Sequence, residues 1–175
     1  SERSITVSNV QGGQVTDERL ACTELEVTLD EPLEPSARTT IAFDLRIELP
    51  AVNDRFGFHR GLALAGSALP VLAVHDDAGW HHVPFEDLGE SFYSVVSDYD
   101  VTFVTPPGLQ TAASGVIVDR AETALGRTRT TVEARQVRDF AWAAGRLRSV
   151  ERSAGALDVI VSYLPCCAMR RSSGA

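Results

Sequence analysis

The chain has 175 residues and a formal net charge of −8, and 44% of its residues are hydrophobic against 23% that are charged. These values are typical of a globular domain with a buried core and exclude an intrinsically disordered chain. The acidic balance disfavours nucleic-acid binding, because an acidic surface repels phosphate. All 16 basic residues are arginine, which excludes chemistry that needs a lysine amine.

The first third of the chain alternates between apolar and polar residues, which is typical of strands. Residues 5–10 and 24–29 are each expected to form a strand, with a tight turn at residues 11–13. Residues 41–49 alternate most regularly, so we expect a strand with its odd-numbered apolar side chains on a buried face. Prolines make the intervening residues 30–38 a loop.

The middle of the chain carries a weaker signal. Residues 53–67 hold three glycines and little periodicity, which predicts a long loop. Residues 70–74 are continuously apolar, which predicts a short strand buried on both faces. A turn at residues 76–79 would lead into a hairpin partner at 80–83. Residues 85–90 are expected to be loop.

The second half is rich in residues that favour strands. Residues 92–105 predict a long strand with Tyr99, Val101 and Phe103 on one face and Asp100 on the other, ended by the prolines that follow. Further strands are expected at residues 113–119, 128–137, 140–142 and 157–164, with a polar turn at residues 121–127.

Turn signals recur about every 8–12 residues, and no segment has a convincing helical repeat. The sequence therefore predicts an all-β fold, a saddle-shaped β-sandwich of mostly antiparallel strands. No apolar run approaches the roughly 20 residues of a membrane-spanning helix.

The three cysteines are Cys22, Cys166 and Cys167. An odd count argues against a disulfide framework, so we interpret them as free thiols. This usage leans slightly towards a reducing compartment.

Histidine and carboxylate side chains gather within residues 75–82, at His75, Asp76, Asp77, His81 and His82. Both residue types are zinc ligands, so a metal site is one interpretation. The favoured interpretation is a polar hairpin tip. Residues 76–79 make an ordinary turn, and adjacent histidines on a strand point to opposite faces.

The sequence carries no complete catalytic motif. Residues 89–93 match only the first half of a serine-hydrolase nucleophile elbow, and no H-E-x-x-H motif or phosphate-binding glycine loop occurs. The bulky aromatic residues are expected in the core, although several exposed on one surface would suit carbohydrate binding. They are Trp80, Tyr93, Tyr99, Phe140 and Trp142.

An ordered series of short segments runs along the chain. They are NDRFG at residues 53–57, LPVLAVHDDAGW at 69–80, GESFYS at 89–94, DYDVT at 98–102, PG at 107–108 and VRDFAWAA at 137–144. The series, from about residue 5 to 165, resembles the N-terminal β-domain of a bacterial branch of the gluzincin zinc aminopeptidases. Aminopeptidase N and the leukotriene hydrolase belong to this family.

The resemblance implies that residues 1–165 are an N-terminal β-domain, incomplete at its start, and that residues 166–175 are a tail or the beginning of a zinc domain. In the family, this β-domain packs over the zinc domain and walls one side of the substrate cleft. The resemblance thus implies two partners: the zinc domain of the same polypeptide and, through the full-length enzyme, a peptide substrate. It also implies an exposed apolar patch for docking.

The family's catalytic motifs, H-E-x-x-H and G-x-M-E-N, do not occur in this sequence. The resemblance therefore implies a chain with no cofactor of its own, inactive alone, with zinc bound elsewhere in the full-length protein. Many relatives supply a substrate-contacting glutamine from a segment that corresponds to residues 75–94. That segment has none here, and Glu90 and Tyr93 are the candidate residues at the edge of the substrate cleft.

Two alternatives remain open. The first is a free-standing β-sandwich that acts as a binding or adhesion module, with aromatic residues exposed on one side. The second is a small enzyme in its own right, which would depend on the histidines and carboxylates of residues 75–82. The compartment stays open as well, because members of the family can be exported or anchored.

Overall fold

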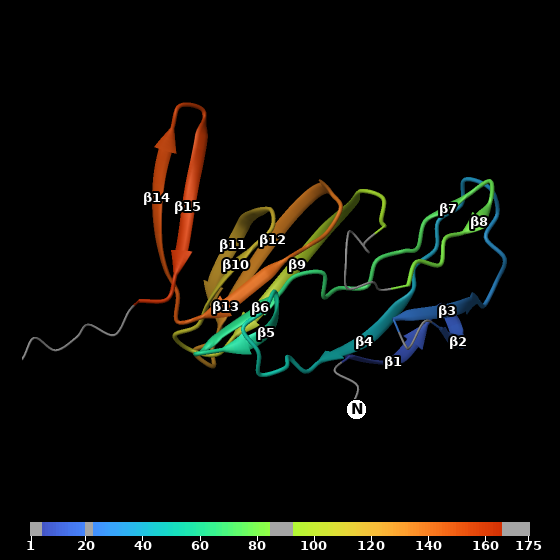
Figure 1. The fold of residues 1–175 in the computed structure, drawn as a ribbon, viewed down its shortest axis with the longest axis horizontal. Coiled ribbons are helices and arrows are strands. Elements are labelled where there is room, and N and C mark those ends of the chain that lie inside the picture. Colours follow the sequence, from blue (N-terminus) through green and yellow to red (C-terminus); the bar gives the residue numbers. More distant parts are fainter. Residues whose placement is uncertain (1–4, 20–22, 85–92, 166–175) are drawn as a thin grey trace, which may run out of the picture. The chain divides into compact units, whose positions relative to one another are not determined.

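The computed structural model describes residues 5–19, 23–84 and 93–165 (Figure 1). Within these ranges every element is a strand and every pairing is antiparallel, so the predicted all-β class is confirmed. No helix in the described part of the chain is long and apolar enough to span a membrane. The three cysteines, Glu90 and the expected loop at residues 85–90 lie outside the described residues.

The strands fall into two compact units. Unit 1 combines Ser1–Pro50 with Val71–Val95, and unit 2 combines Ala51–Pro70 with Val96–Ala175. Unit 1 holds three two-stranded ladders, β1 with β4, β2 with β3 and β7 with β8. Its strands are β1 Ile5–Gln11, β2 Gly13–Arg19, β3 Glu24–Leu29, β4 Ala42–Ile47, β7 His75–Asp76 and β8 Gly79–Trp80.

The sharp bend between β1 and β2 requires a glycine. Gly12 has a φ of +85°, and a Cβ atom there would collide with the carbonyl oxygen of Thr40. Only glycine tolerates both conditions at no cost. The predicted turn at residues 11–13 is confirmed, as are the strands expected at residues 5–10, 24–29 and 41–49, to within two residues at each end.

The expectation that the odd-numbered side chains of residues 41–49 lie on a buried face is wrong. Ile41 is 36% exposed and Phe43 is 38% exposed, while Leu45 and Ile47 are only half-buried. The reason is that β4 pairs with β1 alone, and little covers this ladder. Among the described residues of unit 1, Val74 is the one buried hydrophobic side chain.

Unit 2 is a β-sandwich with an added hairpin. One sheet has the order β10-β13-β6-β5, the other has the order β11-β12-β9, and β14 pairs with β15. The strands are β5 Phe56–His59, β6 Leu62–Ala65, β9 Ser97–Thr105, β10 Gln110–Ala113, β11 Val116–Glu122, β12 Thr128–Val137, β13 Trp142–Gly145, β14 Arg148–Ala154 and β15 Leu157–Tyr163.

The core of unit 2 centres on Phe140, whose side chain is fully buried. Its ring centroid lies 5.5 Å from that of Tyr99 and 6.3 Å from that of Phe103, and Trp142 meets Phe103 edge-on at 5.9 Å. These contacts join β9 of the three-stranded sheet to β13 of the four-stranded sheet. Val132 and Ala134 of β12 complete the buried cluster.

A carboxylate fixes the segment that carries Phe140. Oδ1 of Asp139 accepts a hydrogen bond from the backbone N–H of Phe140 at 2.8 Å. Its Oδ2 accepts bonds from the backbone N–H and the hydroxyl of Ser67, at 3.0 and 2.9 Å. Asp139 thus ties the chain that follows β6 to the residue at the centre of the core.

The prediction of a loop throughout residues 53–67 is wrong, because β5 and β6 form a hairpin there. Arg60 and Gly61 connect the two strands with positive φ values of 50° and 82°. This is the type I′ geometry that matches the twist of paired strands. Gly57 packs so closely on Val52 that a Cβ would collide with its carbonyl oxygen, so this glycine serves strand packing rather than loop flexibility.

Three other expected strands differ from the structure. Residues 70–74 form no strand, and Leu72 is 72% exposed, so burial on both faces is wrong. Instead of joining a ladder, the carbonyl of Val74 accepts a bond from the N–H of His81 at 2.8 Å. The turn at Ser114 and Gly115 divides the strand expected at residues 113–119, and the strand expected at 140–142 begins only at Trp142.

The long central strands of unit 2 agree with the sequence pattern. β12 has the expected bounds, while β9 and β15 lie within the ranges expected for them. Tyr99, Val101 and Phe103 pack against the buried cluster, and Asp100 lies on the opposite, outer face with an ion pair to Arg135. The alternation therefore predicted correctly which face of β9 is buried.

Candidate functional site

The histidine and carboxylate cluster of residues 75–82 is built on the β7–β8 hairpin of unit 1. Oδ1 of Asp76 accepts a hydrogen bond from the backbone N–H of Ala78 at 2.9 Å, which closes the turn. Its Oδ2 lies 2.7 Å from Nε2 of His81. The predicted turn at residues 76–79 is confirmed, although β8 ends at Trp80 and does not extend to residue 83.

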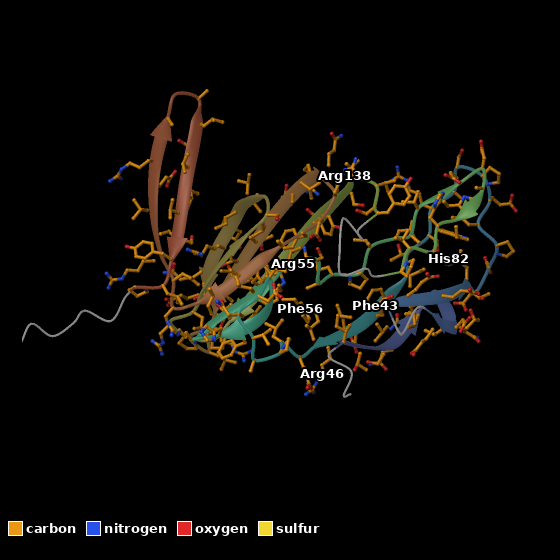
Figure 2. The ribbon with its side chains drawn as sticks, viewed as in Figure 1. Phe43, Arg46, Arg55, Phe56, His82 and Arg138 are labelled. Atoms are coloured by element: carbon orange, nitrogen blue, oxygen red, sulfur yellow. The ribbon has the colours of Figure 1, made fainter. Side chains whose placement is uncertain are left out.

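His82 faces a different partner from its neighbour His81. Its Nδ1 lies 2.6 Å from Oε1 of Glu24, at the start of β3 (Figure 2). The carboxylate of Glu24 is the more buried member of the pair, with 19% of its side chain exposed. The contact links the segment after β8 to β3, so the two histidines bond separate carboxylates, as expected for adjacent residues of an extended chain.

Two aromatic side chains flank the histidines. The ring centroids of His75 and Trp80 lie 4.8 Å apart and those of His81 and Tyr93 lie 5.3 Å apart, both edge-on. Trp80 is 52% exposed and Tyr93 is 50% exposed. The expected core location is therefore wrong for these two residues, because the short β7–β8 ladder leaves their rings half uncovered.

We call the exposed or partly exposed side chains of His75, Asp76, Trp80, His81 and Tyr93 together the histidine–aromatic surface. It has two parts, since strand alternation places the His75–Trp80 pair on one face of the hairpin and Asp76 with His81, beside Tyr93, on the other. Within the described part of the chain, no group of three or more His, Cys, Asp or Glu side chains is arranged to hold a metal ion. One part offers a ligand an indole and an imidazole, and the other offers a phenol ring, an imidazole and a carboxylate. Tyr93 lies in it, beside His81, whereas Glu90 lies outside the described residues.

The hydrogen bonds to Asp76 lower the pKa of its carboxyl group below 3.8, mainly through the Ala78 N–H and then through His81. We expect the Asp76 titration midpoint, followed by NMR of the side-chain carboxyl carbon, to lie below that value. His81→Ala should raise the midpoint only in part, because the larger contribution remains. His82→Ala, which removes a side chain bonded to Glu24, should leave it unchanged.

The sign of the linked stability follows from this depressed pKa. A carboxylate that binds protons less readily when folded stabilises the folded state above its unfolded pKa, and this contribution is lost as the pH falls through the folded pKa. The hairpin should therefore lose stability on acidification below about pH 4. A midpoint at or above 3.8 in the unsubstituted protein would contradict the geometry.

A second candidate surface is the β14–β15 hairpin of unit 2, which alternates cleanly between two faces. The register places Val150, opposite Val161, on the same face as Arg148, Arg152 and Ala154 and their partners Tyr163, Val159 and Leu157. We call this the apolar hairpin face. The other face carries Glu151 and Ile160 together with two polar cross-strand pairs, Ser149 with Ser162 and Ser153 with Asp158.

The apolar hairpin face is uncovered. Its large side chains are 40–70% exposed, at Val150, Leu157, Val159, Val161 and Tyr163. The strand expected at residues 157–164 corresponds to β15, one of the two strands that form this face. Residues 148–154 alternate only between polar, small and valine side chains, so their place in the hairpin needed the structure to be recognised.

Comparisons with protein-family models, curated proteins and solved structures find no match for this chain. The resemblance to the zinc aminopeptidases therefore stays a prediction.

Proposed function

We propose that this chain is the non-catalytic N-terminal β-domain of an aminopeptidase-like zinc metallopeptidase. In this role it packs on the zinc domain of the same polypeptide and walls one side of the peptide cleft. In the full-length enzyme the zinc domain would hold the zinc ion, which would supply polarisation of the scissile carbonyl and activation of water. The β-domain contributes selectivity and positioning, because it narrows access to an otherwise open metal site.

One observation carries this proposal: residues from separate segments of the resemblance meet in the same core. Leu69, Tyr99, Val101, Phe140 and Trp142 come from three of those segments and all belong to the cluster around Phe140. Residues that build a shared core set the fold, so a resemblance concentrated there supports a shared architecture. This supports the β-domain directly and the peptidase role through the family.

The distribution of apolar side chains also supports a domain that packs on another surface. Unit 1 buries one hydrophobic side chain among its described residues, while Ile5, Val15 and Phe43 on its strands are 38–43% exposed. Apolar surface left uncovered in this way is typical of protein interfaces. In the proposed enzyme, Tyr93 and Glu90 stay the candidates for the edge of the substrate cleft.

The experiment is an immunoprecipitation from source cells with an antibody raised to this chain. We expect a polypeptide much larger than 175 residues that hydrolyses an aminoacyl p-nitroanilide. 1,10-Phenanthroline should abolish the activity and added Zn²⁺ should restore it. The purified chain alone is the control and should be inactive. A native product of this size without peptidase activity would overturn the proposal.

A second candidate function, a binding module, is favoured by the histidine–aromatic surface. Trp80 and Tyr93 are half exposed on the same unit and each contacts a histidine. Exposed aromatic rings of this kind stack on sugars or side chains. A glycan or peptide array probed with the chain and with Trp80→Ala tests this function, which requires binding that the substitution abolishes.

A further inference from the structure

The apolar hairpin face has no partner within the part of the chain that the structure describes. Both strands pair only with each other, every β14 residue is exposed, and only Ser162 of β15 is partly buried. A two-stranded hairpin is at best marginally stable in water unless one of its faces packs on something else. On the opposite face two of the three cross-strand pairs hydrogen-bond each other, and Ile160 is its single large apolar side chain, so the apolar hairpin face is the one that most needs cover.

The charges on this face define the chemistry of the surface that covers it. Arg148 and Arg152 lie on the apolar hairpin face, and neither forms an ion pair among the described residues. The acidic residues of the hairpin, Glu151 and Asp158, lie on the opposite face. A partner that covers the apolar side chains must therefore bring its own carboxylates, because a desolvated guanidinium without a counter-charge is costly.

The same charges disfavour two other occupants. A second copy of this face would bring together four arginines with no carboxylate between them. A lipid bilayer would receive Arg152 from the middle of the face, between Val150 and Ala154, where burying a charge in hydrocarbon is unfavourable. A protein surface with apolar side chains and acidic residues satisfies both the valines and the arginines.

We propose that the apolar hairpin face docks an apolar protein surface whose carboxylates pair with Arg148 and Arg152. This inference rests on the proposed function for the identity of the partner, which is then a surface of the zinc domain. The arginines fix the register of docking, since each guanidinium offers a planar fork that suits a carboxylate. The flanking valines, Leu157 and Tyr163 supply the apolar contact.

The test places a photo-crosslinking residue on each face of β15 in the native polypeptide, in source cells. Val159→p-benzoylphenylalanine probes the apolar hairpin face, and Ile160→p-benzoylphenylalanine is the matched control on the opposite face, one residue away and 63% exposed. We expect crosslinked protein at Val159 at least about tenfold above that at Ile160. Mass spectrometry should map it to apolar residues next to Asp or Glu.

A charge series identifies the role of the arginines. Adding Arg152→Glu to the Val159 probe should reduce the crosslink several-fold, while Arg152→Lys, which keeps the charge without the planar fork, should reduce it less. Equal crosslinking at Val159 and Ile160 would overturn the inference. So would a crosslink between light and heavy isotope-labelled copies at Val159, or flotation of the chain with phosphatidylglycerol vesicles that depends on Val159.

The outcomes separate this inference from the proposed function. A Val159 crosslink to an acidic apolar surface of a protein without H-E-x-x-H retains the docking surface and removes the peptidase role. Metal-dependent peptidase activity in the immunoprecipitate, with no crosslink at Val159 above the control, retains the peptidase role and removes the docking surface.

Discussion

Replacing Phe140 with alanine is expected to lower the free energy of unfolding of unit 2 by about 3–5 kcal/mol. The ring is fully buried and contacts Tyr99 and Phe103, so its removal leaves a cavity between the two sheets. A small domain is stable by only about 5–15 kcal/mol, so this loss removes a large share of its stability. Urea unfolding followed by Trp142 fluorescence, in a Trp80→Phe background, measures the loss.

The matched control is Phe58→Ala. Phe58 is an aromatic residue of unit 2 that is 49% exposed on β5. Its truncation should cost less than about 1.5 kcal/mol, since only about half of its area leaves water on folding. Equal losses for the two substitutions would show that Phe140 is not at the centre of the core.

Gly115→Ala is expected to cost about 3 kcal/mol or more, because two unfavourable effects coincide. Gly115 has a φ of +93°. A Cβ there would collide with the carbonyl oxygen of Glu133 and lie 2.8 Å from the Cβ of Ala134. Both neighbours belong to β12, which pairs on both sides and cannot move without disturbing the three-stranded sheet.

Gly155→Ala separates the two effects. Gly155 also has a positive φ, of 66°, but no atom lies within 4 Å of the position a Cβ would occupy. Only the conformational cost of about 1–2 kcal/mol applies there. Thermal unfolding of both variants should therefore show the larger drop for Gly115→Ala. The reverse order would mean that the close approach to β12 is absent in solution.

Local alternation was sufficient to predict the fold class and the central strands. β9 and β12 were predictable because each is long, rich in strand-forming residues and covered on one face, so its side chains follow a period of two. The β5–β6 hairpin was missed because its glycines look like a loop. The signal for this hairpin is the Arg60–Gly61 pair between two short apolar runs. A type I′ turn requires a positive φ at Arg60, a conformation that arginine rarely adopts, so the pair does not look like a turn in the sequence.

The candidate surfaces were less predictable than the core. The turn at Asp76 follows from local chemistry, but the partner of His82 is Glu24, far away in the sequence. Burial of Trp80 was expected from its size alone, and the shortness of the β7–β8 ladder reverses that expectation. The apolar hairpin face depends on the pairing of β14 with β15, because β14 contributes just one large apolar residue, Val150.

The pairing of β6 with β13 has a consequence for synthesis on the ribosome. Ala65 pairs with Trp142, so the four-stranded sheet cannot close until roughly 80 further residues have emerged, about 4–16 s at ordinary rates of elongation. During that time the apolar side chains of the β5–β6 hairpin have no sheet to join. The nascent chain should thus bind a ribosome-associated chaperone until β13 emerges, and a slower-translated message would prolong that dependence.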